Sequence, residues 1–229
     1  MNFQRARTQE QRTERRRQIL TTAAAMLTEM PVAKLSLNEL SRRIGLAKSN
    51  VLRYFESREA VLLELLDAQV QDWITDLERS YGPADGTPRE RGDRLADVLA
   101  TSMVERPVLC DLLSTQTAVL EHNISTQVAI DHKHAAKRAM ADLVQLVTRH
   151  VPEFGPQGAA QLVEVTLLMA GAAWPCDQPT EALQAAYASD PELAAMRLNF
   201  TDVVRRTAEV TISGLLARQQ EPPSAAPTP

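Results

Sequence analysis

The feature that most constrains the fold is the stretch of residues 35–58, which reads LSLNELSRRIGLAKSNVLRYFESR. Ser36 and Glu39 form an S-x-x-E capping box, in which each side chain bonds the backbone N–H of the other, so a helix is expected to begin at Ser36. Gly45 suits the left-handed residue that ends a helix, and a second short helix is expected over residues 48–54. Two short helices joined by a tight turn that contains glycine predict a helix-turn-helix.

Each of these helices has one apolar face. In the first helix Leu37, Leu40 and Ile44 recur at helical spacing, and in the second Val51 and Phe55 supply a new face. These faces indicate a small core, which a further helix has to complete.

That further helix is predicted upstream, from Glu10 to a stop at Pro31. Its apolar residues recur at helical spacing and would cover the core of the motif: Ile19, Ala23, Met26, Leu27 and Met30. Residues 1–8 are polar and basic and are expected to form a mobile arm. The basic side of the helix, residues 12–17, is expected to lie near a phosphate backbone.

The outer face of the motif favours DNA binding. On the first short helix Arg42 and Arg43 stand outside the apolar face. The second helix carries residues whose polar tips bond phosphates and base edges: Lys48, Ser49, Asn50, Arg53 and Tyr54. The alternative interpretation is an ordinary solvated helical hairpin.

The charge of the chain is divided unequally, which supports the DNA-binding interpretation. Residues 1–58 contain 12 Lys and Arg against 5 Asp and Glu, a net charge of +7, whereas the rest has 13 against 24, a net charge of −11. A basic head on an acidic body indicates that only the head meets a polyanion. A chance cluster of arginines near the N-terminus is the alternative.

The rest of the chain is predicted to be helical. Ser57 caps a helix that runs to about Ser80 and whose first turns are apolar on nearly all sides, as expected of a helix that joins two bodies. The chain has few β-branched runs and no hairpin signals, so we predict an all-α protein. Its parts are a DNA-binding domain with an arm and a three-helix helix-turn-helix (1–58), a helical ligand-binding and dimerisation domain (59–218) and a disordered, Pro- and Ala-rich tail (219–229).

Cys110 and Cys176 are far apart in the sequence and belong to no Cys-x-x-Cys motif, so neither a zinc site nor a redox pair is expected. A reducing, cytoplasmic location is the simplest inference. The arginine-rich N-terminus is followed by no apolar signal segment, and no run of about 18 uncharged apolar residues occurs, so we expect neither export nor a membrane span.

At residues 35–62, and most densely in GLAKSNVLRYFESREAVL, the sequence resembles the DNA-binding domain of the tetracycline-repressor (TetR) family of bacterial regulators. The resemblance implies that Lys48 contacts phosphate, that Ser49, Asn50 and Arg53 lie near base edges, and that Phe55 belongs to the core. Leu52 departs from the family, which often has a tyrosine there, so we expect no phosphate contact from it. The DNA-contacting residues expected are Ser36, Arg42, Arg43, Lys48, Ser49, Asn50, Arg53, Tyr54, Ser57 and Arg58.

The resemblance also implies a homodimer that binds a pseudo-palindromic operator in double-stranded DNA and a small-molecule effector in the C-terminal domain. Large, adaptable or polar residues on apolar helix faces are the pocket candidates: Trp73, Met103, Cys110, Gln116, His132, Met169 and Trp174. Two apolar last helices supply the interface candidates: Leu162, Val165, Met169, Val204, Ala208, Thr211 and Leu215. Ordinary core filling and a monomeric bundle are the respective alternatives.

His132 lies on an apolar stripe, so a hydrogen-bonded core histidine is the alternative to a ligand contact. His134, two residues later, points elsewhere, so the pair cannot share a metal, and His150 is expected to cap the end of its helix. No Ser-His-Asp arrangement, phosphate-binding glycine loop or HExxH motif occurs, so we expect no enzyme, cofactor or metal. The alternative to a repressor is a ligand-binding or interaction protein whose DNA-binding head lacks operator specificity.

Overall fold

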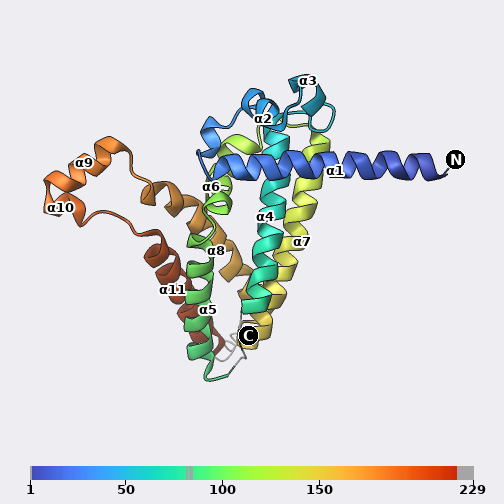
Figure 1. Ribbon diagram of the computed structural model, residues 1–229. Coiled ribbons are helices and arrows are strands. Elements are labelled where there is room, and N and C mark those ends of the chain that lie inside the picture. Colours follow the sequence, from blue (N-terminus) through green and yellow to red (C-terminus); the bar gives the residue numbers. More distant parts are fainter. Residues whose placement is uncertain (1, 81, 83–84, 221–229) are drawn as a thin grey trace, which may run out of the picture. The chain divides into compact units, whose positions relative to one another are not determined.

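The computed structural model describes residues 2–80, 82 and 85–220, and every regular element within them is helical (Figure 1). The all-α prediction is confirmed. The α-helices are α1 (Asn2–Leu27), α2 (Leu37–Ile44), α3 (Lys48–Val51), α4 (Arg58–Ser80), α5 (Pro88–Val104), α6 (Pro107–Thr115), α7 (Thr126–His150), α8 (Gly155–Asp177), α9 (Glu181–Ser189), α10 (Pro191–Ala194) and α11 (Phe200–Gln220). Two 3₁₀ turns, η1 (Val32–Lys34) and η3 (Pro152–Phe154), and a π-helical segment, η2 (Gln116–Leu120), complete the set.

The first helix is longer than the sequence predicted. α1 begins at Asn2 and not near Glu10, so the expected arm over residues 1–8 is helical from its second residue. The segment contains neither Gly nor Pro, and its Arg, Gln and Ala are good helix formers, so nothing in it stops a helix. α1 ends at Leu27, ahead of Pro31, because the residue before a proline disfavours the helical conformation.

Two helices of the C-terminal half end late. α8 continues past Pro175 to Asp177, because a proline in the last turn removes only one backbone hydrogen bond. α11 runs through Gln220, so the first two residues of the predicted tail are helical, and residues 221–229 lie outside the described residues.

The chain folds as two compact units. Unit one consists of residues 1–71 and 107–136, and unit two of residues 72–106 and 137–229. Each unit is therefore built from two separate stretches of sequence. The divisions at residues 71 and 136 fall within α4 and α7.

In unit one, α1 covers the helix-turn-helix with the apolar face that the sequence predicted. Ile19, Ala23 and Met26 are completely buried, as are Leu40 of α2 and Val51 of α3. α1 packs directly on α2, and α2 packs on α3. One small core therefore positions the two short helices.

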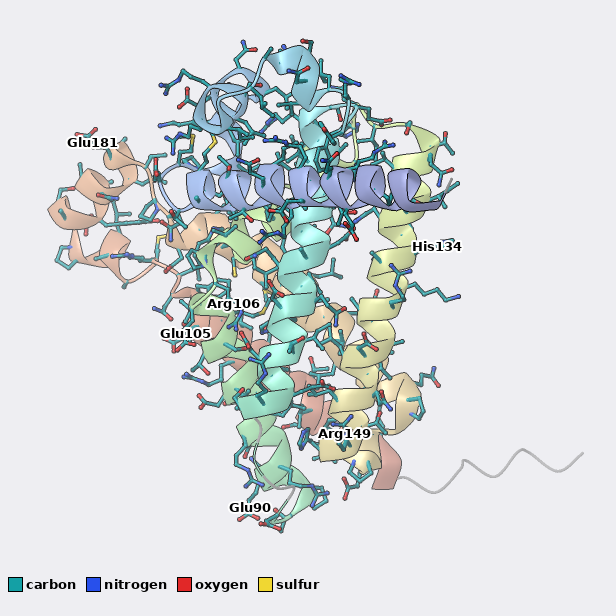
Figure 2. All side chains as sticks on the ribbon, turned by 45° about the vertical axis from the view of Figure 1, so that its right-hand side comes forward. Glu90, Glu105, Arg106, His134, Arg149 and Glu181 are labelled. Atoms are coloured by element: carbon teal, nitrogen blue, oxygen red, sulfur yellow. The ribbon has the colours of Figure 1, made fainter. Side chains whose placement is uncertain are left out.

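In unit two, α11 packs against both α5 and α8. Gly92 of α5 allows the close approach, because a Cβ at this position would lie 2.5 Å from Cγ2 of Ile212 in α11. The rings of Trp174 and Phe200 meet edge to face, with their centroids 5.2 Å apart. Between α8 and α11, α9 and α10 bury no residue and project as an excursion that carries Glu181 (Figures 1 and 2).

The segment Pro152–Asp177 is long and apolar enough to cross a membrane by length and composition alone, with a mean hydropathy of 1.3 in its most apolar window. Core helices pass the same test. Leu162 and Ala170 in this segment are completely buried in unit two, and α8 packs against α11. We therefore interpret α8 as a core helix.

Candidate nucleic-acid interface

The turn between α2 and α3 forms as the sequence predicted. Ser36 Oγ accepts a hydrogen bond from the backbone N–H of Glu39 at 3.2 Å, which begins α2. Gly45 ends the helix with φ of 74°, in the left-handed region that glycine adopts most readily. The second half of the predicted capping box is replaced, because the carboxylate of Glu39 accepts hydrogen bonds from Arg42 and Arg43 instead.

α3 is a single helical turn, continued by a hydrogen-bonded turn over residues 52–54. Together they separate buried from exposed side chains. Val51 is completely buried and Phe55 is only 3% exposed. The opposite face is exposed and consists of Lys48, Ser49, Asn50 and Arg53, with Tyr54 half-buried beside them. Within the described part of the chain, the side chains of these four exposed residues form no hydrogen bond or ion pair. They are therefore available to an external partner.

The two arginines of α2 are partly neutralised within the chain. Arg42 is well exposed and pairs with Glu39 at 2.6 Å, whereas Arg43 lies between Glu29 at 2.7 Å and Glu39 at 3.2 Å. The guanidinium groups of Arg42 and then Arg43 hold the pKa of Glu39 below its usual value, so this carboxylate stays charged near neutral pH. Arg42 is the more accessible of the two to a phosphate.

The start of α4 is capped as expected, but Arg58 is engaged within unit one. Ser57 Oγ accepts the backbone N–H of Ala60 at 3.0 Å. Arg58 donates to the carbonyl oxygen of Val32 at 2.5 Å and to Glu59 at 3.2 Å. A contact between Arg58 and DNA stays a prediction.

Arg16 has a structural position that its sequence context did not predict, because the sequence shows it only as one of several neighbouring positive charges. Its guanidinium lies 4.3 Å from the centroid of the Phe55 ring. It also donates to the carbonyl oxygen of Tyr54 and pairs with Glu64 of α4. Arg16 therefore supports the turn that follows α3. Its spacing of three residues from Ile19, on the buried face of α1, was the available signal.

Two further side chains connect the helix-turn-helix to α6 and α7 within unit one. Asp111 of α6 accepts the backbone N–H of Val32 in η1 at 2.6 Å. Glu56, between α3 and α4, accepts the backbone N–H of Ser125 at the start of α7 at 2.5 Å. Neither contact carries a sequence signal, since both join residues that lie about 70 or more positions apart.

The predicted pocket residues are divided between the units. Unit one holds Cys110, Gln116 and His132, and unit two holds Trp73, Met103, Met169 and Trp174. Within unit two, Trp73 donates its indole N–H to Ser102 Oγ at 2.9 Å. A surface hollow of about 390 Å³ is lined by Ser102, Asp76 and Arg106, and the last two form an ion pair at 2.5 Å.

Gln116 and His132 do come together, in a buried polar network of unit one. His132 is only 4% exposed, and its Nδ1 lies 2.8 Å from Asp67 Oδ1. Its Nε2 lies 3.1 Å from Gln116 Nε2, which also donates to Glu121 at 3.0 Å. Lys133 lies 2.7 Å from Glu121 and holds the pKa of that carboxylate below its usual value. This arrangement is that of a hydrogen-bonded core histidine, whereas His134 is exposed and points away from α7 (Figure 2).

Three predicted interface residues, Leu162, Val204 and Ala208, are completely buried in unit two. A side chain with no exposed surface in one chain cannot contact a second chain, so the prediction for these three is corrected. Their face of α8 and α11 forms the core of the unit. The other candidates are partly exposed: Val165, Met169, Thr211 and Leu215.

The same two helices expose other large apolar side chains. Leu168 of α8 is 66% exposed and Val210 of α11 is 68% exposed. Neither residue was predicted from the sequence, because both lie off the apolar stripes of α8 and α11, which form the core. An apolar residue off the core stripe of an otherwise amphipathic helix was the available signal.

Two family models match the chain. Residues 19–65 match the model described as "Bacterial regulatory proteins, tetR family", and residues 67–219 match "Tetracyclin repressor-like, C-terminal domain". The second match alone covers more than half of the chain.

Individual relatives agree with these matches. The HTH-type transcriptional regulator EthR of Mycobacterium tuberculosis (strain CDC 1551 / Oshkosh) is 40% identical over 73 residues, which are 31% of this chain and 33% of the relative. The chain thus matches about a third of that relative's length. A TetR transcriptional regulator from Rhodococcus sp. RHA1 has the same fold, with a TM-score of 0.57 at 14% identity over 91% of this chain and 98% of that one. A putative TetR-family regulator from Mesorhizobium loti gives 0.55 at 16% identity over 90% and 97%.

Proposed function

The chain belongs to the TetR family of bacterial transcriptional regulators, and from this membership we propose that it is a repressor that binds a pseudo-palindromic operator as a homodimer. It is a regulator with a helix-turn-helix DNA-binding domain, a class of protein that is generally not enzymatic and acts in the cytoplasm. The observation that supports the proposal is the exposed face of α3 and of the turn after it. There the side chains of Lys48, Ser49, Asn50 and Arg53 form no hydrogen bond or ion pair with the described residues that would compete with DNA.

In this proposal α3 enters the major groove. Asn50 has the amide geometry that bonds adenine, and Arg53 has the guanidinium that bonds guanine O6 and N7. Lys48 contacts a phosphate and so fixes the orientation of the helix without reading sequence. The buried Val51 and Phe55 fix which face of α3 and of the following turn is exposed.

A homodimer would place its two α3 helices in successive major grooves, about 34 Å apart, which is why the operator is expected to be pseudo-palindromic. The exposed Leu168 and Val210 support pairing through α8 and α11, because large apolar side chains on neighbouring helices lose unfavourable contact with water when a second copy covers them.

We further propose that a small-molecule effector binds within residues 59–218 and lowers the affinity of the protein for DNA. The domain division at residue 58 remains part of this proposal, with DNA contact before it and effector binding and pairing after it. Support comes from the side chains of this segment, which combine buried apolar groups with hydrogen-bonded polar groups, as is typical of ligand-binding interiors. Trp73 is an example, because it is buried and its indole N–H donates to Ser102 Oγ.

The alternative is a protein whose head binds DNA without operator specificity. Leu52, which is 41% exposed on the outer side of the turn after α3, favours it, because the resemblance implies a tyrosine that reaches the DNA backbone here. Strong dependence on salt without discrimination between sequences would identify this case.

A mobility-shift titration tests the proposal. The probe is the DNA that flanks the protein's own gene, and the control is a scrambled duplex of the same length and composition. A repressor is expected to bind the flanking DNA at least about 1,000-fold more tightly than the control and to protect one site with two related halves. Equal, weak binding to the two duplexes would contradict the proposal and support the alternative.

A further inference from the structure

The outer side of α2 carries opposite charges in equal number. Arg42 and Arg43 stand there, and the carboxylates of Glu39 in the same helix and of Glu29 after α1 lie against them. Two positive charges are thus matched by two negative charges within hydrogen-bonding distance. The exposed face of α3 is different, since its Lys48 forms no ion pair with any residue that the structure describes.

The position of Glu39 allows it to bond both arginines. Residues three and four positions apart are neighbours on a helix surface, so Arg42 and Arg43 both reach this carboxylate. Arg42 donates through Nε at 3.0 Å and through Nη2 at 2.6 Å, one bond to each carboxylate oxygen. One planar edge of the Arg42 guanidinium is therefore fully used, and such an edge would otherwise be able to bind two oxygens of a phosphate.

The two arginines differ in how firmly they are held. The side chain of Arg43 is 28% exposed and lies between two carboxylates, with Glu29 at 2.7 Å and Glu39 at 3.2 Å. The side chain of Arg42 is 74% exposed, and among the described residues its ion-pair partner is Glu39. Arg42 is therefore the side chain that can exchange its partner for a phosphate, whereas Arg43 connects α2 to the turn after α1.

The carboxylate of Glu39 remains charged at neutral pH. Hydrogen bonds from Arg42 and then from Arg43 hold its pKa below the usual value. Glu39 therefore cannot release Arg42 by taking up a proton in the neutral range. In a helix-turn-helix the first helix crosses the sugar-phosphate backbone, so a phosphate and Glu39 would compete for the same guanidinium.

We propose that Glu39 limits the affinity for DNA, because its carboxylate competes with DNA phosphate for Arg42 and so weakens binding to DNA of any sequence. This inference rests on the proposed function, since it requires α2 to lie against the DNA backbone. The competition concerns phosphate contact and leaves sequence preference to α3. Coupling between an effector and a second ligand typically changes affinity only about 5–150-fold. Limiting the affinity for DNA therefore keeps it within the range that an effector can reverse.

The variant E39Q tests this competition. Glutamine removes the charge but keeps the size of the side chain and the backbone N–H that Ser36 caps. The matched control is D93N, which removes one carboxylate from the exposed pair of Arg89 and Asp93 in α5 and so changes the net charge equally. Binding to the flanking DNA and to its scrambled control is measured by fluorescence anisotropy between 50 and 200 mM NaCl. Urea unfolding shows that each variant is folded.

E39Q is expected to steepen the slope of log K against log salt by up to about 0.9, the value of one phosphate contact. Because such a contact vanishes near 1 M salt, the affinity for each duplex is expected to rise by up to about eightfold at 0.1 M. D93N is expected to leave both quantities nearly unchanged. In the background R42Q, the additional change E39Q is expected to gain much less, because the arginine that it would release is absent.

Three outcomes would overturn the inference. Weaker binding by E39Q would show that Glu39 orients Arg42 towards phosphate. An equal gain in D93N would show an effect of net charge alone, and an equal gain in the R42Q background would show that Arg42 is not involved. The proposed function is tested separately: if the wild type bound the two duplexes equally, the operator-specific repressor would be refuted, but E39Q could still be compared with the wild type on either duplex.

Discussion

Lys48, Asn50 and Arg53 share the exposed side of one helical turn, yet their side chains have different chemistry. The lysine ammonium is a point charge suited to phosphate, whereas the amide of Asn50 and the guanidinium of Arg53 can each form two hydrogen bonds to one base. Contacts to phosphate and contacts to bases have different consequences for sequence preference, so substitutions can separate them.

Replacing Asn50 or Arg53 by Ala is expected to cost about 1–3 kcal/mol of binding to the operator and little on other DNA, so sequence preference falls. Lys48→Ala is expected to weaken binding to all sequences alike and to lower the salt slope by about one. Competitive titrations on the protected site and its scrambled control measure the two effects. If all three variants weakened the two duplexes equally, the assignment of base contacts to α3 would be wrong.

His150 at the end of α7 predicts a pH dependence of folding. Burial, and then the charge of Arg149, lower its pKa, so the folded state disfavours the imidazolium. The unfolded state binds a proton near the ordinary pKa of about 6.5, so the free energy of unfolding falls as the pH drops below about 6.5 towards the lowered value.

The variant H150Q, which does not titrate, is expected to lose less stability over this range. Urea unfolding midpoints of the wild type and H150Q at pH 7.5 and pH 5.5 measure the difference. The carboxylate of Glu153, whose pKa Arg91 lowers, contributes only at more acidic pH, below the ordinary range of glutamate. Identical pH dependence of the two proteins would rule out His150 as the titrating group.

For single residues, the sequence predicts which side chains are exposed better than it predicts which side chains form long-range contacts. The exposed positions of Lys48, Asn50 and Arg53 follow from helical periodicity alone. The contacts of Arg16 and Arg58 do not, because each arginine bonds a backbone carbonyl far away in the chain. Helical periodicity predicts the direction in which a side chain points, but not which residues it contacts there.

Among the elements, η1 is held from two sides. Asp111 of α6 accepts the N–H of Val32, and Arg58 of α4 donates to the carbonyl oxygen of the same residue. Val32 is completely buried, so water cannot replace either partner. The backbone of one buried residue, Val32, therefore links the start of the helix-turn-helix to α4 and α6.

Asp111→Ala is expected to destabilise the protein by about 1–3 kcal/mol, because it leaves a buried N–H without an acceptor. D111N keeps an uncharged acceptor in the same place and is expected to cost clearly less. Chemical denaturation of the two variants provides the measurement. A loss in D111N as large as that in D111A would indicate that packing of the side chain, and not the hydrogen bond, matters.

The sequence predicts which segments are helical more accurately than where they end. Gly45 marks a boundary that the structure confirms, because its backbone preference is local. The early start of α1 and the π-helical η2 were missed. A helix continues through any segment without a stop signal, and the change to π geometry in η2, where Gln116 joins the network around His132, depends on tertiary contacts.

For the whole molecule, pairing through α8 and α11 can be tested with charge. Leu168→Glu or Val210→Glu is expected to convert a homodimer to monomers, because a carboxylate would lose its hydration in the interface. Leu183→Glu in α9 is the control, since Leu183 is an exposed leucine outside these two helices, 47% exposed. Light scattering coupled to size exclusion reports the mass of each variant. A mass unaffected by either change would refute this interface.

The division into units is the part of the architecture that the sequence predicts least. Periodicity treats the chain as consecutive segments, whereas unit one combines residues 1–71 with residues 107–136. For the same reason, the sequence did not predict that the pocket candidates are divided between the two units. Residues with suitable chemistry were recognisable in the sequence, but nothing local indicates in which unit each would lie.

The discontinuity of unit one also has a consequence during synthesis on the ribosome. The N-terminal portion of the unit ends at residue 71, but the segment that completes it ends only at residue 136. At about 5–20 residues per second, translation of the intervening chain takes from about 3 to 13 seconds. During that time the nascent helix-turn-helix lacks its hydrogen bonds with Asp111 and Ser125. It therefore leaves the ribosome first but completes its tertiary contacts late.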